Sequence, residues 1–279
     1  MQETLSPQGD FPNPHIINPT STHTCTLVML HGRGSDGEEF ADEFLIESHL
    51  SDKSSLLDAF PGARWVFPSS KQLWSTAFEE DMPAWFEAYS PSDTTSRQDL
   101  QTAGTKDSVA YVQSILDEEL MRLGGRKERL FLGGISQGGA IAMLTLFGRG
   151  ALSCGAAFVT NTWLPFAENL ERSLPVSKDQ AVTESTGDDD YDGFVQTLTS
   201  EFPKRDKDSE ELPPIFFGHG VDDAYVDVSL GRQARDVLIN VGFSVDWREY
   251  SGADLEGHWF KVPEQMEDIK RFLDKLLDC

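Results

Sequence analysis

The chain has 279 residues, of which 39% are hydrophobic, and its 47 acidic residues against 23 basic ones give a net charge of −24. Nucleic acid and anionic membrane surfaces repel such a chain, so neither is expected as a partner. No run of about 18 apolar residues predicts a membrane span, and the first residues lack a signal peptide's basic and apolar regions, so we expect a soluble protein of the cytoplasm.

The first part of the chain predicts a leader followed by strands that alternate with helices. Residues 1–24, rich in Pro, Thr and Ser, are expected to be loosely ordered. An apolar strand over 26–30 leads into the segment HGRG at 31–34, whose glycines let the backbone approach a ligand closely. A strand near 64–67 and a helix over 106–122 follow, and the helix carries one apolar stripe.

The segment LFLGGISQGGAIA at 130–142 combines a short apolar strand, a serine flanked by glycines, and the start of a helical pattern. Gly134 and Gly138 stand two residues on either side of Ser136. A strand that turns sharply into a helix strains its corner residue and leaves no room for neighbouring side chains. We therefore interpret the segment as a nucleophile elbow, with the oxygen of Ser136 exposed above the sheet.

After a strand expected near 155–159, the stretch 177–212 is polar and acidic. Three consecutive aspartates at 188–190 suggest calcium, but the ordered spacing and final glutamate of a calcium loop are missing, so we interpret the stretch as a solvated insertion. Some of its apolar residues have helical spacing and predict a short amphipathic helix, hypothesised to lie over the site as a lid: Phe194, Val195, Leu198 and Phe202.

The last part of the chain predicts a buried strand over 214–220 with two carboxylates, Asp222 and Asp223, directly after it. A loop over 251–258 ends in His258. The other elements expected here are a helix over 228–240, a strand over 245–250 and a helix that begins at Pro263. Strands alternating with helices indicate a single α/β domain over 25–279, with a mainly parallel sheet covered on both faces.

Acyl transfer at a serine needs a base, a carboxylate that orients the base, and two donors for the oxyanion. In hydrolases with this elbow, the carboxylate and then the histidine follow the serine, and His258 alone comes after the two aspartates. Successive side chains of an extended segment point in opposite directions, so only one of Asp222 and Asp223 should face His258. The expected oxyanion donors are the amide of Gln137 and an amide from 31–34.

The remaining histidines are given other roles. We expect His15, His23 and His49 to be solvated, because they lie in the leader or at a polar helix end. His31 and His219 each end a strand before a glycine, which favours packing or support of a turn.

Six blocks occur in order between Thr26 and Leu277: LHGRG at 30–34, MPAWF at 82–86, GISQGG at 134–139, TWLP at 162–165, HGVDDAYV at 219–226 and the loop ending at His258. Together they resemble the phospholipase/carboxylesterase family, which includes the acyl-protein thioesterases. The resemblance implies an α/β-hydrolase fold with Ser136 as nucleophile, Asp223 as orienting acid and His258 as base. It also implies oxyanion donors from the backbone of Arg33 and Gln137.

The chain departs from the family pattern at several positions. Family members usually have an apolar residue at Arg33 and often proline at Ala224 and Asp227, and they cross the gap occupied here by 177–212 quickly. The guanidinium of Arg33 either pairs with a carboxylate of the substrate or turns to solvent and surface acids.

These patterns predict a serine esterase or thioesterase that works through an acyl-enzyme and requires no metal or organic cofactor. An apolar acyl pocket is expected from Trp85, Phe86, Trp163 and Leu164, although burial in the core explains such residues as easily. The resemblance places Trp85 and Trp163 at aromatic positions of the acyl site. One alternative is a hydrolase of a small metabolite ester, lactone or carrier-bound thioester, and another is a binding protein without catalysis.

Overall fold

The structure, a computed structural model, describes residues 11–90, 93–174, 191–203 and 211–277. Among these residues, no helix is both long and apolar enough to span a bilayer. The strands are β1 (His15–Ile17), β2 (Cys25–Leu30), β3 (Ala63–Phe67), β4 (Lys71–Ser75), β5 (Glu80–Ala84), β6 (Leu130–Ile135), β7 (Ala156–Thr160), β8 (Ile215–Gly220) and β9 (Val245–Tyr250). The helices are α1 (Gly37–Asp42), α2 (Leu56–Ala59), α3 (Gln101–Arg122), α4 (Gln137–Thr145), α5 (Ala151–Ser153), α6 (Ala167–Ser173), α7 (Asp192–Leu198), α8 (Val228–Val241) and α9 (Glu264–Leu277).

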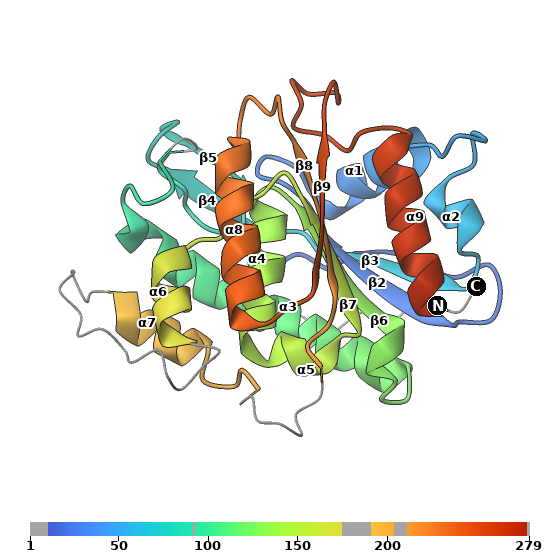
Figure 1. Cartoon of the computed structure of the whole chain (residues 1–279), viewed down its shortest axis with the longest axis horizontal. Helices are drawn as coiled ribbons and strands as arrows, with labels where there is room; N and C mark the ends of the chain where they lie inside the picture. The colour runs from blue at the N-terminus through green and yellow to red at the C-terminus, as the bar shows by residue number, and fades with distance from the viewer. Residues whose placement is uncertain (1–10, 91–92, 175–190, 204–210, 278–279) are drawn as a thin grey trace.

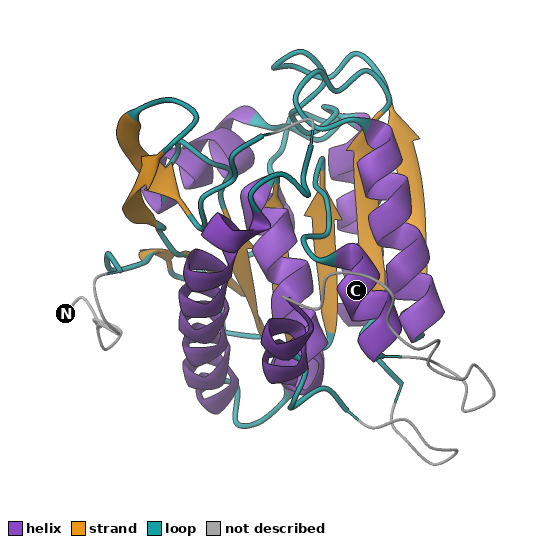
Figure 2. Cartoon of the chain, turned by 90° about the vertical axis from the view of Figure 1, so that its left-hand side faces the viewer, coloured by secondary structure: helices purple, strands orange, loops and turns teal. Residues whose placement is uncertain are grey.

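A seven-stranded sheet in the order β1-β3-β2-β6-β7-β8-β9 forms the centre of the molecule, and β4 and β5 make a separate two-stranded ribbon (Figure 1). Strand β1 is antiparallel to β3, and the other strands of the large sheet run parallel. The mainly parallel α/β sheet predicted from the sequence is confirmed. Because parallel strands end at one edge, the segments that follow β2, β6, β7, β8 and β9 meet at a common rim (Figure 2).

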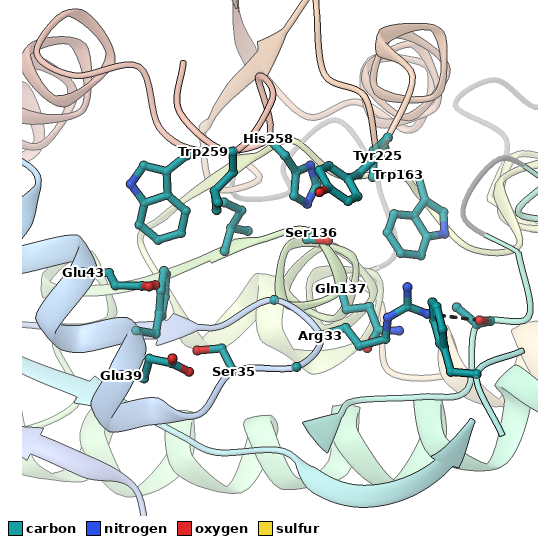
Figure 3. A pocket seen from close by; sticks show the side chains of 18 residues that line it. Arg33, Ser35, Glu39, Glu43, Ser136, Gln137, Trp163, Tyr225, His258 and Trp259 are labelled. Atoms are coloured by element: carbon teal, nitrogen blue, oxygen red, sulfur yellow. Dashed lines mark hydrogen bonds between the residues drawn. The ribbon is translucent and has the colours of Figure 1, made fainter. Parts of the chain in front are cut away.

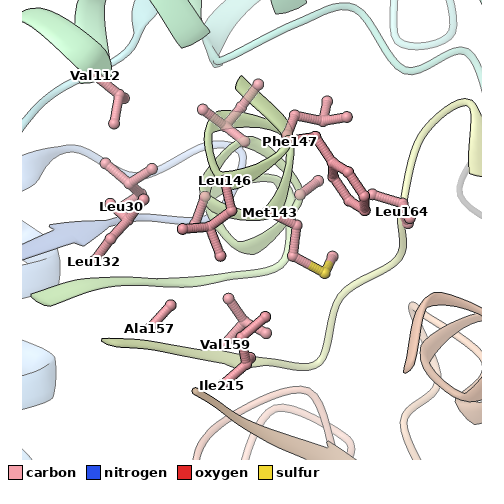
Figure 4. Close-up of a cluster of buried hydrophobic side chains, with 14 of the residues drawn as sticks. Leu30, Val112, Leu132, Met143, Leu146, Phe147, Ala157, Val159, Leu164 and Ile215 are labelled. Carbon is pink, nitrogen blue, oxygen red and sulfur yellow. The ribbon is translucent and has the colours of Figure 1, made fainter. Parts of the chain in front are cut away.

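Both faces of the sheet are buried. Along β2, Leu27 and Met29 join one apolar cluster, whereas Val28 and Leu30 join the other, as the two-residue period of a strand requires. Helices α3, α4 and α8 cover the face of Leu30, and α1, α2 and α9 cover the opposite face (Figure 1). Figure 4 shows the cluster that contains Leu30, packed around α4. Burial of each large side chain contributes about 1.5–3 kcal/mol, an upper range because unfolded chains are already partly compact.

The predicted loose leader is wrong for residues 11–24. Strand β1 pairs with β3, with Ile16 opposite Val66. The ring of Phe11 is buried and stacks on Tyr111 with centroids 4.1 Å apart. A strand of three residues is too short to show a period, and its Pro- and Thr-rich flanks mimic a linker. Residues 1–10 lie outside the described residues.

Part of the acidic insertion is described, and it forms the predicted short helix as α7. The ring of Phe194 on α7 lies 5.0 Å from that of Phe166, and Val195 is fully buried in the core. Helix α7 therefore packs beside α6, at the lower left of Figure 1 and away from the rim, so the lid prediction is wrong for this helix. Residues 175–190, with the aspartates at 188–190, and residues 204–210 lie outside the described residues.

Strand β9 is the outer strand of the sheet beside β8. Its side chains are half-buried or exposed and include charged groups. Arg248 pairs with Asp246 at 2.9 Å, and Arg232 of α8 pairs with Glu249 at 2.8 Å. Charged side chains thus cover this edge of the sheet.

Candidate active site

Ser136 stands at the corner between β6 and α4 in a conformation that residues other than glycine rarely adopt, with φ 54° and ψ −125°. Neighbouring backbone packs tightly around this corner. A Cβ on Gly134 would lie 2.6 Å from the carbonyl carbon of Gly138, and one on Gly138 would lie 2.3 Å from the carbonyl oxygen of Leu30. Only glycine fits at these two positions, which is the physical content of the elbow motif.

Strand β7 holds the corner in place. The amide of Ser136 donates to the carbonyl oxygen of Thr160 at 3.2 Å. The hydroxyl of Thr162 donates to the carbonyl oxygen of Ser136 at 2.7 Å. The strained conformation is therefore held through both the amide and the carbonyl oxygen of Ser136. Ser136 borders a cavity at the rim.

His258 and Asp223 meet at the same rim. The Nδ1 atom of His258 lies 2.8 Å from Oδ2 of Asp223, and because a carboxylate accepts hydrogen bonds, Nδ1–H is the donor. The other oxygen of Asp223 accepts from the amides of Tyr225 at 2.8 Å and Val226 at 2.9 Å. The carboxylate is fully buried, whereas the His258 side chain is 16% exposed. This arrangement leaves Nε2 of His258 available toward the cavity.

The imidazole of His258 and the side chain of Ser136 lie next to each other at the cavity (Figure 3). Among the described residues, neither the hydroxyl of Ser136 nor Nε2 of His258 makes a hydrogen bond. Hydrogen bonds between catalytic groups are often long or poorly aligned before the substrate is bound. The geometry thus places the imidazole of His258 between the side chain of Ser136 and the carboxylate of Asp223.

Asp222 does not contact His258. Its Oδ2 accepts a hydrogen bond from the amide of Gly252 at 2.7 Å, which joins the two loops at their surface. The alternation of side chains left open which aspartate faces His258, and the family resemblance implied Asp223. The structure has Asp223 in contact with His258.

Asn161 is a residue of this rim that the sequence reasoning missed. It is buried at the end of β7 with φ 46°. Its Oδ1 accepts from the amide of Gly220 at 2.9 Å, and its Nδ2 donates to the carbonyl oxygens of Gly257 at 3.2 Å and Trp259 at 3.0 Å. One side chain thus joins the ends of β7 and β8 to the loop that carries His258. A polar residue directly after a buried strand is the only sequence signal for it.

Two other histidines are buried and structural, as predicted. His31 donates from Nδ1 to the carbonyl oxygen of Gly32 at 2.6 Å and accepts at Nε2 from the amide of Ser70 at 3.0 Å, and burial lowers its pKa to about 4. His219 donates from Nε2 to the carbonyl oxygen of Val226 at 2.9 Å, and burial lowers its pKa as well. Burial thus disfavours the charged form of both imidazoles, and both support turns at the rim.

The loop after β2 is fixed next to Ser136. The indole of Trp85 donates to the carbonyl oxygen of His31 at 2.8 Å. The amide of Gly34 donates to the carbonyl oxygen of Pro83 at 2.8 Å. Arg33 lies between these two anchors and borders the cavity. Its amide is thus carried by a rigid loop.

Gln137 is the residue after the serine, and its side chain is fully engaged. Its Oε1 accepts from the amide of Trp85 at 3.2 Å, and its Nε2 donates to the carbonyl oxygen of Phe86 at 3.1 Å. The group that Gln137 can offer to a ligand is therefore its backbone amide.

The cavity has a volume of about 560 Å³. Of the four residues expected to form an acyl pocket, Trp163 lines the cavity, whereas Trp85, Phe86 and Leu164 do not. These three side chains are buried in the core, where Figure 4 shows Leu164. The apolar wall instead includes Phe40 of α1 and three residues of the rim loops that the sequence reasoning missed: Tyr225, Leu255 and Trp259. The sequence shows that a side chain is apolar but not whether it faces the core or a cavity.

Comparison with known proteins shows that the chain is similar to members of one family. The model of the phospholipase/carboxylesterase family matches residues 11–192. The chain is 31% identical over 278 residues to acyl-protein thioesterase 1 of Mycosarcoma maydis, covering 94% of this chain and 96% of that protein. It is 26% identical over 268 residues to acyl-protein thioesterase 1 of Yarrowia lipolytica, with 95% and 97% coverage.

Solved structures show the same fold. The crystal structure of Arabidopsis thaliana SOBER1 has a TM-score of 0.65 at 23% identity, covering 91% of this chain and 99% of that one. Acyl-protein thioesterase 2 of Zea mays has a TM-score of 0.64 at 24% identity, with 95% and 98% coverage. The fold is that of the α/β-hydrolases.

Proposed function

The chain belongs to the phospholipase/carboxylesterase family of α/β-hydrolases, and on that premise we propose that it cleaves carboxylic esters or thioesters through an acyl-enzyme formed on Ser136. The observation that carries the proposal is the contact of 2.8 Å between His258 Nδ1 and Asp223 Oδ2, beside a serine held at a strained corner of the same cavity. A buried carboxylate that fixes the tautomer of an imidazole is what a general base next to a serine requires.

In the first half of the reaction, the hydroxyl oxygen of Ser136 attacks the acyl carbon while Nε2 of His258 takes its proton. The carbonyl oxygen becomes an oxyanion, which the amides of Arg33 and Gln137 stabilise. Because both amides belong to fixed segments, they need little reorganisation as charge develops. His258 then gives its proton to the departing alcohol or thiol.

In the second half, water replaces the leaving group. His258 takes a proton from the water as it attacks the acyl carbon of the ester on Ser136, and the carboxylic acid departs as the serine regains its proton. Asp223 keeps its negative charge throughout and stabilises the imidazolium that forms.

The proposal is tested with a fluorophosphonate probe that reacts with activated serines. We expect one adduct, located on Ser136 by peptide mass spectrometry, and its loss in Ser136→Ala together with ester hydrolysis. The matched control is Ser35→Ala, because Ser35 also lines the cavity but is not at the elbow. An intact, folded protein that forms no adduct and hydrolyses no ester would instead indicate a binding protein on a hydrolase fold.

The curated relatives are named acyl-protein thioesterases and the cavity has an apolar wall, both of which favour a lipidated protein as substrate. The charged side chains that also line the cavity, Arg33, Glu39 and Glu43, favour a small polar ester instead. Turnover of a palmitoylated peptide is to be compared with that of short-chain esters. A higher kcat/KM for the peptide supports the first substrate class, and a higher value for short esters supports the second.

A further inference from the structure

Arg33 places a cation inside the proposed catalytic cavity. Its guanidinium carbon lies 4.8 Å from the centre of the Phe78 ring, within the range of a cation–π contact. Its Nη1 donates a hydrogen bond of 3.4 Å to the carbonyl oxygen of Ala88. The side chain is therefore half-buried against the turn between β4 and β5 instead of extending into solvent (Figure 3).

Within the described part of the chain, no carboxylate forms an ion pair with Arg33. Other arginines do have such partners, as Arg232 has in Glu249 at 2.8 Å. Acids are not scarce, since the chain has 47 acidic residues. Burial lowers the pKa of the Arg33 guanidinium, the direction that desolvation imposes on a cation, although the group keeps its charge. A partly desolvated cation without a counter-charge is costly, and an anionic ligand would reduce that cost.

The opposite side of the same cavity is acidic. Glu39 of α1 and Glu43 line it, and in Figure 3 they lie across Ser136 from Arg33. Burial raises the pKa of Glu43, and the charges of Glu39 and Glu47 raise it further. An anionic group is therefore repelled from this side and attracted toward Arg33, which sets the direction in which a charged ligand lies.

We propose that Arg33 binds a free carboxylate of the substrate, so that the preferred substrates are esters or thioesters that carry a carboxylate besides the bond to be cleaved. This inference rests on the proposed hydrolase function. With Nη1 used on Ala88, the guanidinium keeps further N–H donors in the fixed planar arrangement that suits a carboxylate. Two sources fit this chemistry, a monoester of a dicarboxylic acid and an ester whose leaving group carries the acid.

Two pairs of substrates separate these sources. Monoethyl adipate and ethyl heptanoate differ in charge on the acyl side, and para-butanoyloxybenzoate and phenyl butanoate differ on the leaving-group side. For each pair, kcat/KM of the anionic substrate is divided by that of the neutral one. This ratio cancels effects of a substitution that act on both substrates.

We expect Arg33→Met to lower the ratio of at least one pair by about 10- to 100-fold, the worth of a charge-assisted hydrogen bond. Arg33→Lys should lower it less, because the charge remains while the planar donor set is lost. The matched control is Arg97→Met, which removes an exposed arginine paired with Asp99 away from the cavity and should leave both ratios as in the parent. Thermal melting verifies that each variant is folded.

A fall confined to the adipate pair assigns the carboxylate to the acyl group, and a fall confined to the benzoate pair assigns it to the leaving group. Ratios that stay within about twofold of the parent for both pairs overturn the role of Arg33, whatever the overall rate. If the neutral esters are hydrolysed and Ser136 is labelled in that case, the hydrolase function stands and only this inference fails. If the parent neither hydrolyses any ester nor takes the label, both fail.

Discussion

Asp223 is the residue on which the geometry of the proposed triad depends most. Its two oxygens accept from three donors, the imidazole of His258 and the amides of Tyr225 and Val226, and its carboxylate has no contact with solvent. The two backbone amides hold the carboxylate in place, and the carboxylate in turn fixes which nitrogen of His258 carries the proton.

Replacement of Asp223 by Asn tests this role. The amide keeps the size of the side chain but allows the wrong tautomer of His258, so we expect kcat on a short-chain ester to fall about 10⁴-fold. Asp222→Asn is the matched control, because it removes the same charge one residue away and affects only the contact with Gly252. Similar losses of kcat in both variants would contradict the assignment of Asp223.

The residue scale also shows where sequence reasoning is reliable. Ser136, Asp223 and His258 could be chosen because motif, chain order and family blocks restrict them, and the structure brings all three to one rim. Trp85 and Leu164 could not be placed, because an apolar side chain packs equally well in the core or along a cavity.

Asn161 couples elements that are far apart in the chain. Its side chain ties β8 at Gly220 to the loop around His258, and its backbone amide donates to the carbonyl oxygen of Gly218 at 3.1 Å. The position of His258 is thus set from the end of β7, the strand that also holds Ser136.

We expect Asn161→Ala to displace His258 and to lower kcat about 100-fold, since a shift of about 1 Å in a catalytic group has effects of this size. The rate at which the fluorophosphonate labels Ser136 should fall in parallel, because it depends on the same base. Asn240→Ala, which removes a surface contact with Glu171, serves as the control and should match the parent in both measurements. A variant with an unchanged labelling rate would show that the loop holds His258 without Asn161.

Elements differ in how far the sequence reveals them. Strands β2, β6 and β8 are buried on both faces and appear as continuous apolar runs, so they could be predicted. Strand β1 and the ribbon of β4 and β5 could not, because their pairing partners, and not their own patterns, make them strands. The place of α7 depends on its contact with α6, which no local pattern encodes.

On the scale of the whole molecule, buried histidines with lowered pKa make stability depend on pH. Burial lowers the pKa of His31 from 6.5 to about 4 and that of His219 in the same direction. Between about pH 4 and pH 6.5, the interval set by the two pKa values of His31, the unfolded chain binds more protons than the folded one. The free energy of unfolding therefore rises with pH over this interval. The contribution of His31 is complete above pH 6.5 and is lost as pH falls to about 4, and it amounts to about 3 kcal/mol.

Urea denaturation measured from pH 7 down to pH 4.5 checks this expectation. The parent should lose stability on acidification, and His31→Asn, which has no imidazole to protonate, should lose less over the same interval. The comparison uses the slope of the free energy of unfolding against pH. A destabilisation by the substitution that is the same at every pH does not change this slope. Parallel slopes would mean that His31 is protonated equally in the folded and unfolded states.

The charged outer strand β9 has a consequence for concentrated solutions. An outermost strand offers unpaired backbone groups to which a second copy can add, the first step toward aggregation. Here an added strand would have to strip water from the pairs Asp246–Arg248 and Glu249–Arg232. The contact with Arg232 also lowers the pKa of Glu249, so this protection against self-association persists into more acidic solution than an ordinary glutamate would allow.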